Sequence, residues 1–152
     1  LRLVLGADAA GGGTKVAVLP SDAVPKLQYA AYLSGSVLNE CAMGLHHKLA
    51  HQLGGMYSLD HSSLHCALLP FTANYNLEHS ATMREALGRA VGDKDDSAGA
   101  LWDLQKRLDA PTSLRAIGFK LEHASVAAAQ AEAAARTANT PNPRPIVAAD
   151  ME

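Results

Sequence analysis

Five of the seven histidines of this 152-residue chain lie within one stretch of twenty-two residues. His47 and His51 are four residues apart, and His61 and His65 repeat this spacing. On an α-helix, residues four apart share one face, with Cβ atoms about 5–6 Å apart. Gly54-Gly55 separates the two pairs, and glycine readily takes the left-handed conformation that ends a helix. The stretch therefore predicts a helix, a turn and a second helix.

Histidine spacing alone leaves two interpretations open, structural histidines or a functional site. Neutral imidazole is a common metal ligand, and it can act as an acid or base near pH 7. No Asp or Glu stands at the right spacing on the first predicted helix to complete a metal site. The H-E-x-x-H pattern of metalloproteases is absent, because Lys48 and Leu49 follow His47. The chemistry of the stretch must therefore come from the histidines themselves.

We expect the side chains of His47, His51, His61 and His65 to converge on one cavity. The glycine turn lets the start of the second helix face the end of the first. Burying imidazoles without partners would cost free energy for each unsatisfied nitrogen, so the site should be open to solvent, substrate or metal. His46 should lie on a different helix face, about 100° from its neighbour.

The apolar pattern of the whole chain predicts an all-α, bundle-like fold. Apolar residues recur every fourth position and predict one long central helix over 26–53. Each such step drifts about 40° around the axis, which implies that this helix is buried on several sides. Helical patterns continue to the alanine-rich segment 122–138, and no run alternates as a strand would. We expect one helical domain at 23–152, preceded by a linker or partial segment at 1–22.

Composition excludes several classes of partner. The net charge is −2 and the isoelectric point is near 6.4, which predicts no binding to nucleic acid. No apolar run reaches the roughly 18 residues of a membrane span, and no signal peptide pattern is present. Cys41 and Cys66 stand in apolar contexts and are typical of free thiols in a reducing compartment. The sequence thus predicts a cytoplasmic protein that does not bind membranes.

The histidine stretch resembles a known family. G-L-H-H-K-L-A-H-Q-L-G-G at 44–55, D-H-S-S-L-H at 60–65 and L-L-P-F at 68–71 are similar to the histidine signature of the iron-containing alcohol dehydrogenase superfamily. The H-H-K at 46–48, the histidine at 65 and N-P-R-P at 142–145 favour its maleylacetate reductase branch. The resemblance begins near residue 23. It implies the helical C-terminal domain of the dehydroquinate synthase-like fold, without the N-terminal domain that binds nicotinamide.

The resemblance also implies roles for the histidines. His47 and His61 match two histidines that bind metal in the dehydrogenases, where the metal is iron or zinc. His51 matches a histidine near the substrate that is assigned a proton-transfer role, and His65 matches one typical of maleylacetate reductases. We therefore expect His51 and His65 to be catalytic, and no residue of this chain to bind the cofactor. In that branch, catalysis can also proceed without metal.

The activity implied by the resemblance is reduction of the dicarboxylate maleylacetate to 3-oxoadipate with NADH or NADPH, a step in the degradation of aromatic compounds. A homodimer is expected for the full-length form. Two alternatives stay open: a fragment of an iron- or zinc-dependent alcohol dehydrogenase, and a helical domain that binds a metal or partner without catalysis. Because hydride transfer needs a bound nicotinamide, this chain alone should be inactive. The chain departs from the family at Asp60, where a proline is usual.

Overall fold

Helices make up the framework of the described part of the chain, residues 21–137 and 140–147 of a computed structural model. The elements in order are α1 (Ala23–Glu40), α2 (Leu45–Tyr57), α3 (His61–Leu77), α4 (Ala81–Val91), α5 (Ser97–Arg107), the 3₁₀ turns η1 (Arg115–Ile117) and η2 (Leu121–His123), and α6 (Ala124–Thr137). No strand occurs among these residues, so the all-α prediction is confirmed. The predicted segment 1–22 lies almost wholly outside the described residues.

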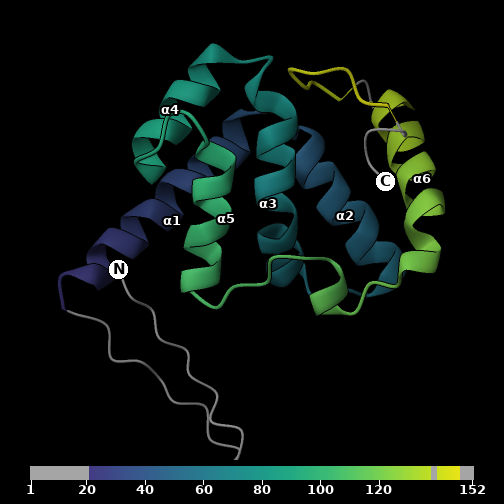
Figure 1. Cartoon of the computed structure of the whole chain (residues 1–152), viewed down its shortest axis with the longest axis horizontal. Helices are drawn as coiled ribbons and strands as arrows, with labels where there is room; N and C mark the ends of the chain where they lie inside the picture. Colours follow the sequence, from purple (N-terminus) through teal and green to yellow (C-terminus); the bar gives the residue numbers. More distant parts are fainter. Residues whose placement is uncertain (1–20, 138–139, 148–152) are drawn as a thin grey trace, which may run out of the picture.

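Helix α3 lies at the centre of the fold (Figure 1). It packs against α2, α4 and α5, and α2 also packs against α6. The core between α2, α3 and α6 consists of Ala50, Leu53, Leu64, Leu68 and Ala127. The two helices that carry the histidines are therefore held together by apolar contacts on their inner faces.

Helix α3 continues through Pro70, although a proline inside a helix usually kinks or ends it. Proline has no N–H, so the carbonyl of Cys66, four residues earlier, receives no bond from it. The side chain of Gln105, on α5, donates to that carbonyl over 2.8 Å. Because an unsatisfied buried carbonyl costs free energy, this contact from a neighbouring helix allows α3 to pass the proline.

The predicted single helix over 26–53 is wrong, because the chain is not helical from Cys41 to Gly44. A Cβ atom on Gly44 would lie 3.3 Å from the carbonyl oxygen of Pro141. The amide of Leu45 lies 3.4 Å from the side-chain oxygen of Asn142 and donates to it. A segment almost a hundred residues later thus approaches the start of α2, and this contact cannot be seen in local spacing.

The glycine pair does not end α2, contrary to the prediction. Gly54 and Gly55 lie inside the helix, which continues to Tyr57. The left-handed residue is Ser58, with φ of 52°. Packing of Leu53 in the core offsets the low helix propensity of glycine, which is about 1 kcal/mol per residue. The reversal of the chain therefore falls three residues later than expected.

Helix α1 is exposed, although the sequence predicted burial on several sides. Ala23 is its only buried residue. Tyr29, Tyr32 and Val37 are each more than 60% exposed. None of the helix pairs that pack extensively in the described part of the chain includes α1. The apolar pattern of this helix thus marks a surface, not a core position.

Within residues 21–137 and 140–147, every helix is too short or too polar to cross a membrane.

Replacing Gly55 with Ala should stabilise the chain by about 0.5–1 kcal/mol, because glycine in a helix interior is less favourable than alanine by that amount. An added Cβ at this position meets nothing within 4 Å. Urea unfolding measures the change. Gly92, with φ of 81°, is the control, and its replacement with Ala should destabilise. A loss of stability for Gly55→Ala would contradict the helical conformation described above.

Replacing Gln105 with Leu should destabilise the chain by about 1–3 kcal/mol, because the Cys66 carbonyl loses its donor. Combining Gln105→Leu with Pro70→Ala supplies a backbone N–H at position 70 instead. We expect the Gln105→Leu cost to shrink in the Pro70→Ala background, which a double-mutant cycle of urea unfolding measures. Equal costs in both backgrounds would show that the side chain does not compensate for the proline.

Candidate functional site

A three-residue turn, 58–60, places the histidines of α3 opposite those of α2. Asp60 caps α3, and its carboxylate accepts from the backbone N–H of Ser63 and from the hydroxyl of Ser62, each over 2.8 Å. These bonds lower the pKa of Asp60 to about 2. Asp60 thus starts α3 by capping it, and His61 becomes the first residue of that helix.

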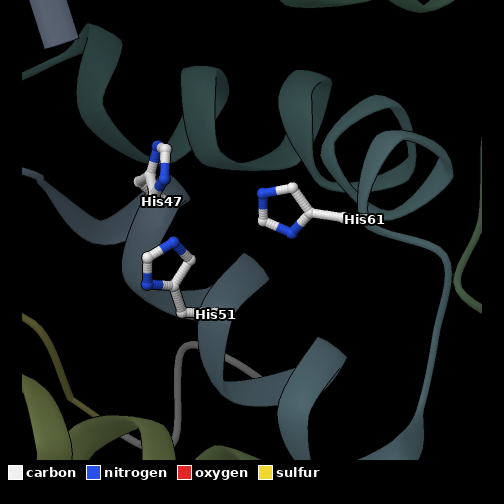
Figure 2. A group of neighbouring side chains, drawn as sticks. All are labelled: His47, His51 and His61. Atoms are coloured by element: carbon white, nitrogen blue, oxygen red, sulfur yellow. The ribbon is translucent and has the colours of Figure 1, made fainter.

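The four predicted site residues lie together. The ring centroids of His47 and His51 are 4.6 Å apart, and those of His61 and His65 are 4.4 Å apart. Across the two helices, His47 lies 6.1 Å from His61 and 4.9 Å from His65. Figure 2 shows the rings of His47, His51 and His61 pointing toward one another. The structure therefore brings the predicted residues to one place, and the role of each stays a prediction.

His46 joins this group, although the sequence placed it on a different face. Its Nε2 lies 2.8 Å from Nδ1 of His65, and its Nδ1 lies 2.9 Å from the hydroxyl oxygen of Thr72. Both partners stand on α3, which crosses α2 on that side. Spacing along α2 fixes only the angle of His46 around that helix and not the position of α3. The crossing helix lets residues 100° apart on α2 reach the same neighbour.

The surroundings of His46, His47 and His65 favour the neutral form of these three imidazoles. Burial, together with the neighbouring rings of His65 and His47, lowers the pKa of His46 to about 4. Desolvation and the nearby His51 and His61 lower the pKa of His47. The pKa of His65 is lowered by desolvation and by the same group of rings. Neutral rings are the form that binds metals and accepts protons.

Three ring nitrogens, one each from His47, His51 and His61, all lie within 4.8 Å of one another. Zinc binds imidazole nitrogen at 2.0–2.1 Å, so ligands of a tetrahedral ion stand about 3.3 Å apart. His51 and His61 are exposed and can rotate to close this difference. Three neutral imidazoles with a free fourth position are the ligand set of some catalytic zinc sites. The residues present therefore fit a divalent metal.

Two cavities adjoin α2. One, of about 670 Å³, is lined by His46 and His47 and extends to Met83 and to residues 141–143. The other, of about 400 Å³, is apolar and lined by Leu49 and Leu53 on the opposite face of the helix. Two histidines of the cluster, His46 and His47, line the first cavity, so it is the one we associate with the site, whereas His51, His61 and His65 lie outside its lining.

The N-P-R-P segment, 142–145, contributes to the wall of the cavity that His46 and His47 line. Asn142 donates to the side-chain oxygen of Asn76 over 2.7 Å and accepts from the Asn76 amide over 3.2 Å. The guanidinium of Arg144 lies 4.3 Å from the ring centroid of Tyr75. In the sequence, only the family resemblance pointed to this segment. In the structure, Asn142 binds the end of α3 and the start of α2. Its partner Asn76 lies 66 residues earlier, so no local pattern could predict the pair.

Residues 20–152 match the C-terminal profile of the Fe-containing alcohol dehydrogenase family. The chain is 40% identical over 130 residues to a maleylacetate reductase from Burkholderia cepacia, covering 84% of this chain and 35% of that protein. It is 38% identical over 125 residues to one from Pseudomonas sp. strain P51, covering 82% and 34%. The chain thus spans about a third of the length of these curated relatives.

Solved structures of similar proteins agree with the fold. The maleylacetate reductase from Rhizobium sp. strain MTP-10005 matches with a TM-score of 0.76 and 35% identity, over 87% of this chain and 36% of that one. The maleylacetate reductase from Agrobacterium tumefaciens matches with a TM-score of 0.62 and 37% identity, over 72% and 29%.

We expect the 152-residue chain to bind one Zn²⁺ ion through His47, His51 and His61. Loss of partners outside the ligand shell typically weakens metal binding 10–100-fold, so His61→Ala should weaken it at least about tenfold. Isothermal titration calorimetry measures the affinity. The control is His79→Ala, since His79 is exposed and lies outside the cluster. Equal affinities for the two variants would remove His61 from the metal site.

Proposed function

Because this chain belongs to the Fe-containing alcohol dehydrogenase family, we propose that it is the C-terminal catalytic part of an NAD(P)H-dependent maleylacetate reductase. The observation that carries the proposal is the histidine cluster formed by α2 and α3. It occurs in a chain that is 35–41% identical to proteins named maleylacetate reductase. The cluster supplies acid–base groups, and two of its histidines, His46 and His47, line a cavity large enough for a small dicarboxylate.

The reaction adds a hydride and a proton across the carbon–carbon double bond of maleylacetate, giving 3-oxoadipate. The chemistry that a nicotinamide would supply, if held by the rest of the enzyme, is hydride donation. A proton must then reach the neighbouring carbon or an enolate oxygen. Positioned histidines suit that step because imidazole can both donate and accept a proton. The chain's part in the reaction is therefore to hold the substrate and to deliver the proton.

We assign the proton transfer to His51 or His65. His51 is exposed at the edge of the cluster, where a substrate can reach it. His47 and His61 stand on the two different helices and can hold a metal or a substrate carboxylate between them. Lys48, which follows His47 directly, adds positive charge for an acidic substrate. This arrangement favours a small dicarboxylate over a neutral alcohol.

A second candidate is a metal-dependent alcohol dehydrogenase. The convergence of three nitrogens in one group favours it, since this ligand set fits iron or zinc. When bound, such a metal supplies Lewis-acid polarisation of a substrate oxygen. The relatives named maleylacetate reductase favour the first proposal. Activity that survives chelation of the metal would separate the two.

Several further properties belong to the same proposal. The full-length protein uses NADH or NADPH, acts in the cytoplasm on a product of aromatic degradation, and forms a homodimer. The net charge of −2 is consistent with a small-molecule substrate and not with nucleic acid.

A chimera tests the proposal. In it, this chain replaces the matching C-terminal segment of the Burkholderia cepacia relative, which then provides the rest of the enzyme. We expect the chimera to oxidise NADH or NADPH in the presence of maleylacetate. The 152-residue chain alone should not oxidise the cofactor, because we expect none of its residues to bind the nicotinamide. A folded chimera that reduces an aldehyde but not maleylacetate would favour the dehydrogenase.

In the active chimera, His51→Ala should lower kcat by on the order of 10²–10⁴-fold, the usual range for losing general acid–base help. His79→Ala is the matched control, because it removes an exposed imidazole outside the cluster. Circular dichroism of both variants checks that the fold is intact. An unchanged kcat for His51→Ala would transfer the proton-donating role to another residue.

A further inference from the structure

A line of hydrogen-bonding atoms runs from the core into the histidine cluster. The hydroxyl oxygen of Thr72 lies 3.0 Å from the carbonyl oxygen of Leu68 and 2.9 Å from Nδ1 of His46. Nε2 of His46 lies 2.8 Å from Nδ1 of His65. Nε2 of His65 lies 3.1 Å from Nε2 of His61. His46 and His65 each use both ring nitrogens in this line, whereas His61, at its outer end, uses only Nε2.

We propose that His46, anchored by Thr72, is a positioning residue that fixes His65 with its proton on Nδ1 and directs an unprotonated Nε2 into the cluster. The proposal depends on the direction in which each hydrogen bond donates. Distances alone do not give this direction, because either tautomer of a neutral imidazole can join a line of this kind. The inner end of the line gives it.

The hydroxyl of Thr72 has one proton and three neighbours that can accept it. Two are carbonyl oxygens, of Leu68 at 3.0 Å and of Leu69 at 3.3 Å. If the proton pointed to His46, the hydroxyl lone pairs would face both carbonyl oxygens with no proton between them. Thr72 is buried, so water would not relieve that repulsion. The hydroxyl therefore donates to the carbonyls and accepts from Nδ1–H of His46.

The remaining directions follow from the number of protons on a neutral ring. His46 is partly buried between Thr72 and His65, where a second proton would create a desolvated cation beside another imidazole, so the ring is neutral and carries one proton. That proton is on Nδ1, so Nε2 of His46 accepts, and the donor is Nδ1–H of His65. The proton of His65 is then also placed, and its Nε2 has a free lone pair. This lone pair faces Nε2 of His61, which must donate to it.

The line has a consequence for the proposed reductase, on which this step rests. In its resting form, Nε2 of His65 accepts a hydrogen bond and carries no proton that it could donate. The proton delivered to the substrate must come from another group, and His51 is the imidazole of the cluster that is exposed and outside the line. Nε2 of His65 instead accepts a hydrogen bond from an N–H or O–H group, and this bond orients His61 or a substrate hydroxyl.

Long-range proton–nitrogen correlation spectra of the ¹⁵N-histidine-labelled, chelator-treated chain test the tautomer directly. For His65, we expect Nδ1 to show the shift of a protonated ring nitrogen and Nε2 that of an unprotonated one. The opposite pattern, with the proton on Nε2, would overturn the proposal. The measurement uses the 152-residue chain and no substrate, so it stands whether or not the reductase activity is found.

Two variants of Thr72 test the anchor. Thr72→Val keeps the shape but removes the acceptor, and the two ring nitrogens of His65 should then move toward a common averaged shift. Thr72→Ser keeps the hydroxyl and should preserve the wild-type pattern. His46→Gln, whose amide oxygen can accept from His65 in place of Nε2, should preserve it as well, whereas His46→Phe should lose it. A wild-type pattern in both Thr72→Val and His46→Phe, with the helical circular dichroism intact, would show that neither residue fixes the tautomer.

Discussion

The hydrogen bond from Gln105 to the carbonyl of Cys66 supports the element on which the rest of the fold depends. Pro70 leaves that carbonyl without its helical donor, and a buried helix end there would divide α3 in two. With the carbonyl satisfied from α5, α3 stays continuous from its cap at Asp60 to its end near Asn76. A single straight helix can then contact α2, α4 and α5 at once.

The continuity of α3 links its two ends to one site. His61 and His65 occupy its first turns, Thr72 holds His46 two residues after Pro70, and Asn76 pairs with Asn142 at the far end. The inner face of the same helix supplies Leu64 and Leu68 to the core. Packing thus fixes the helix, and polar contacts along its length fix the histidine rings and the approach of the C-terminal segment.

The sequence was sufficient for what depends on local spacing. The i,i+4 pairs at His47 and His61 predicted two helices and their convergence, and the signature around them predicted the family. It was insufficient wherever a distant residue decides the outcome. The break before Leu45 depends on Asn142, and the passage of α3 through Pro70 depends on Gln105. The contact of His46 with the cluster was not foreseen for the same reason, because its partners stand on a different helix.

The shortness of the turn at 58–60 bears on the order in which contacts form during folding. Because it is so short, the histidines of α2 and α3 meet after closure of a small loop, and the entropy lost in closing a loop grows with its length. Contacts between residues close in sequence form early in folding. The α2–α3 hairpin can therefore assemble its imidazoles before the segment carrying Asn142 arrives.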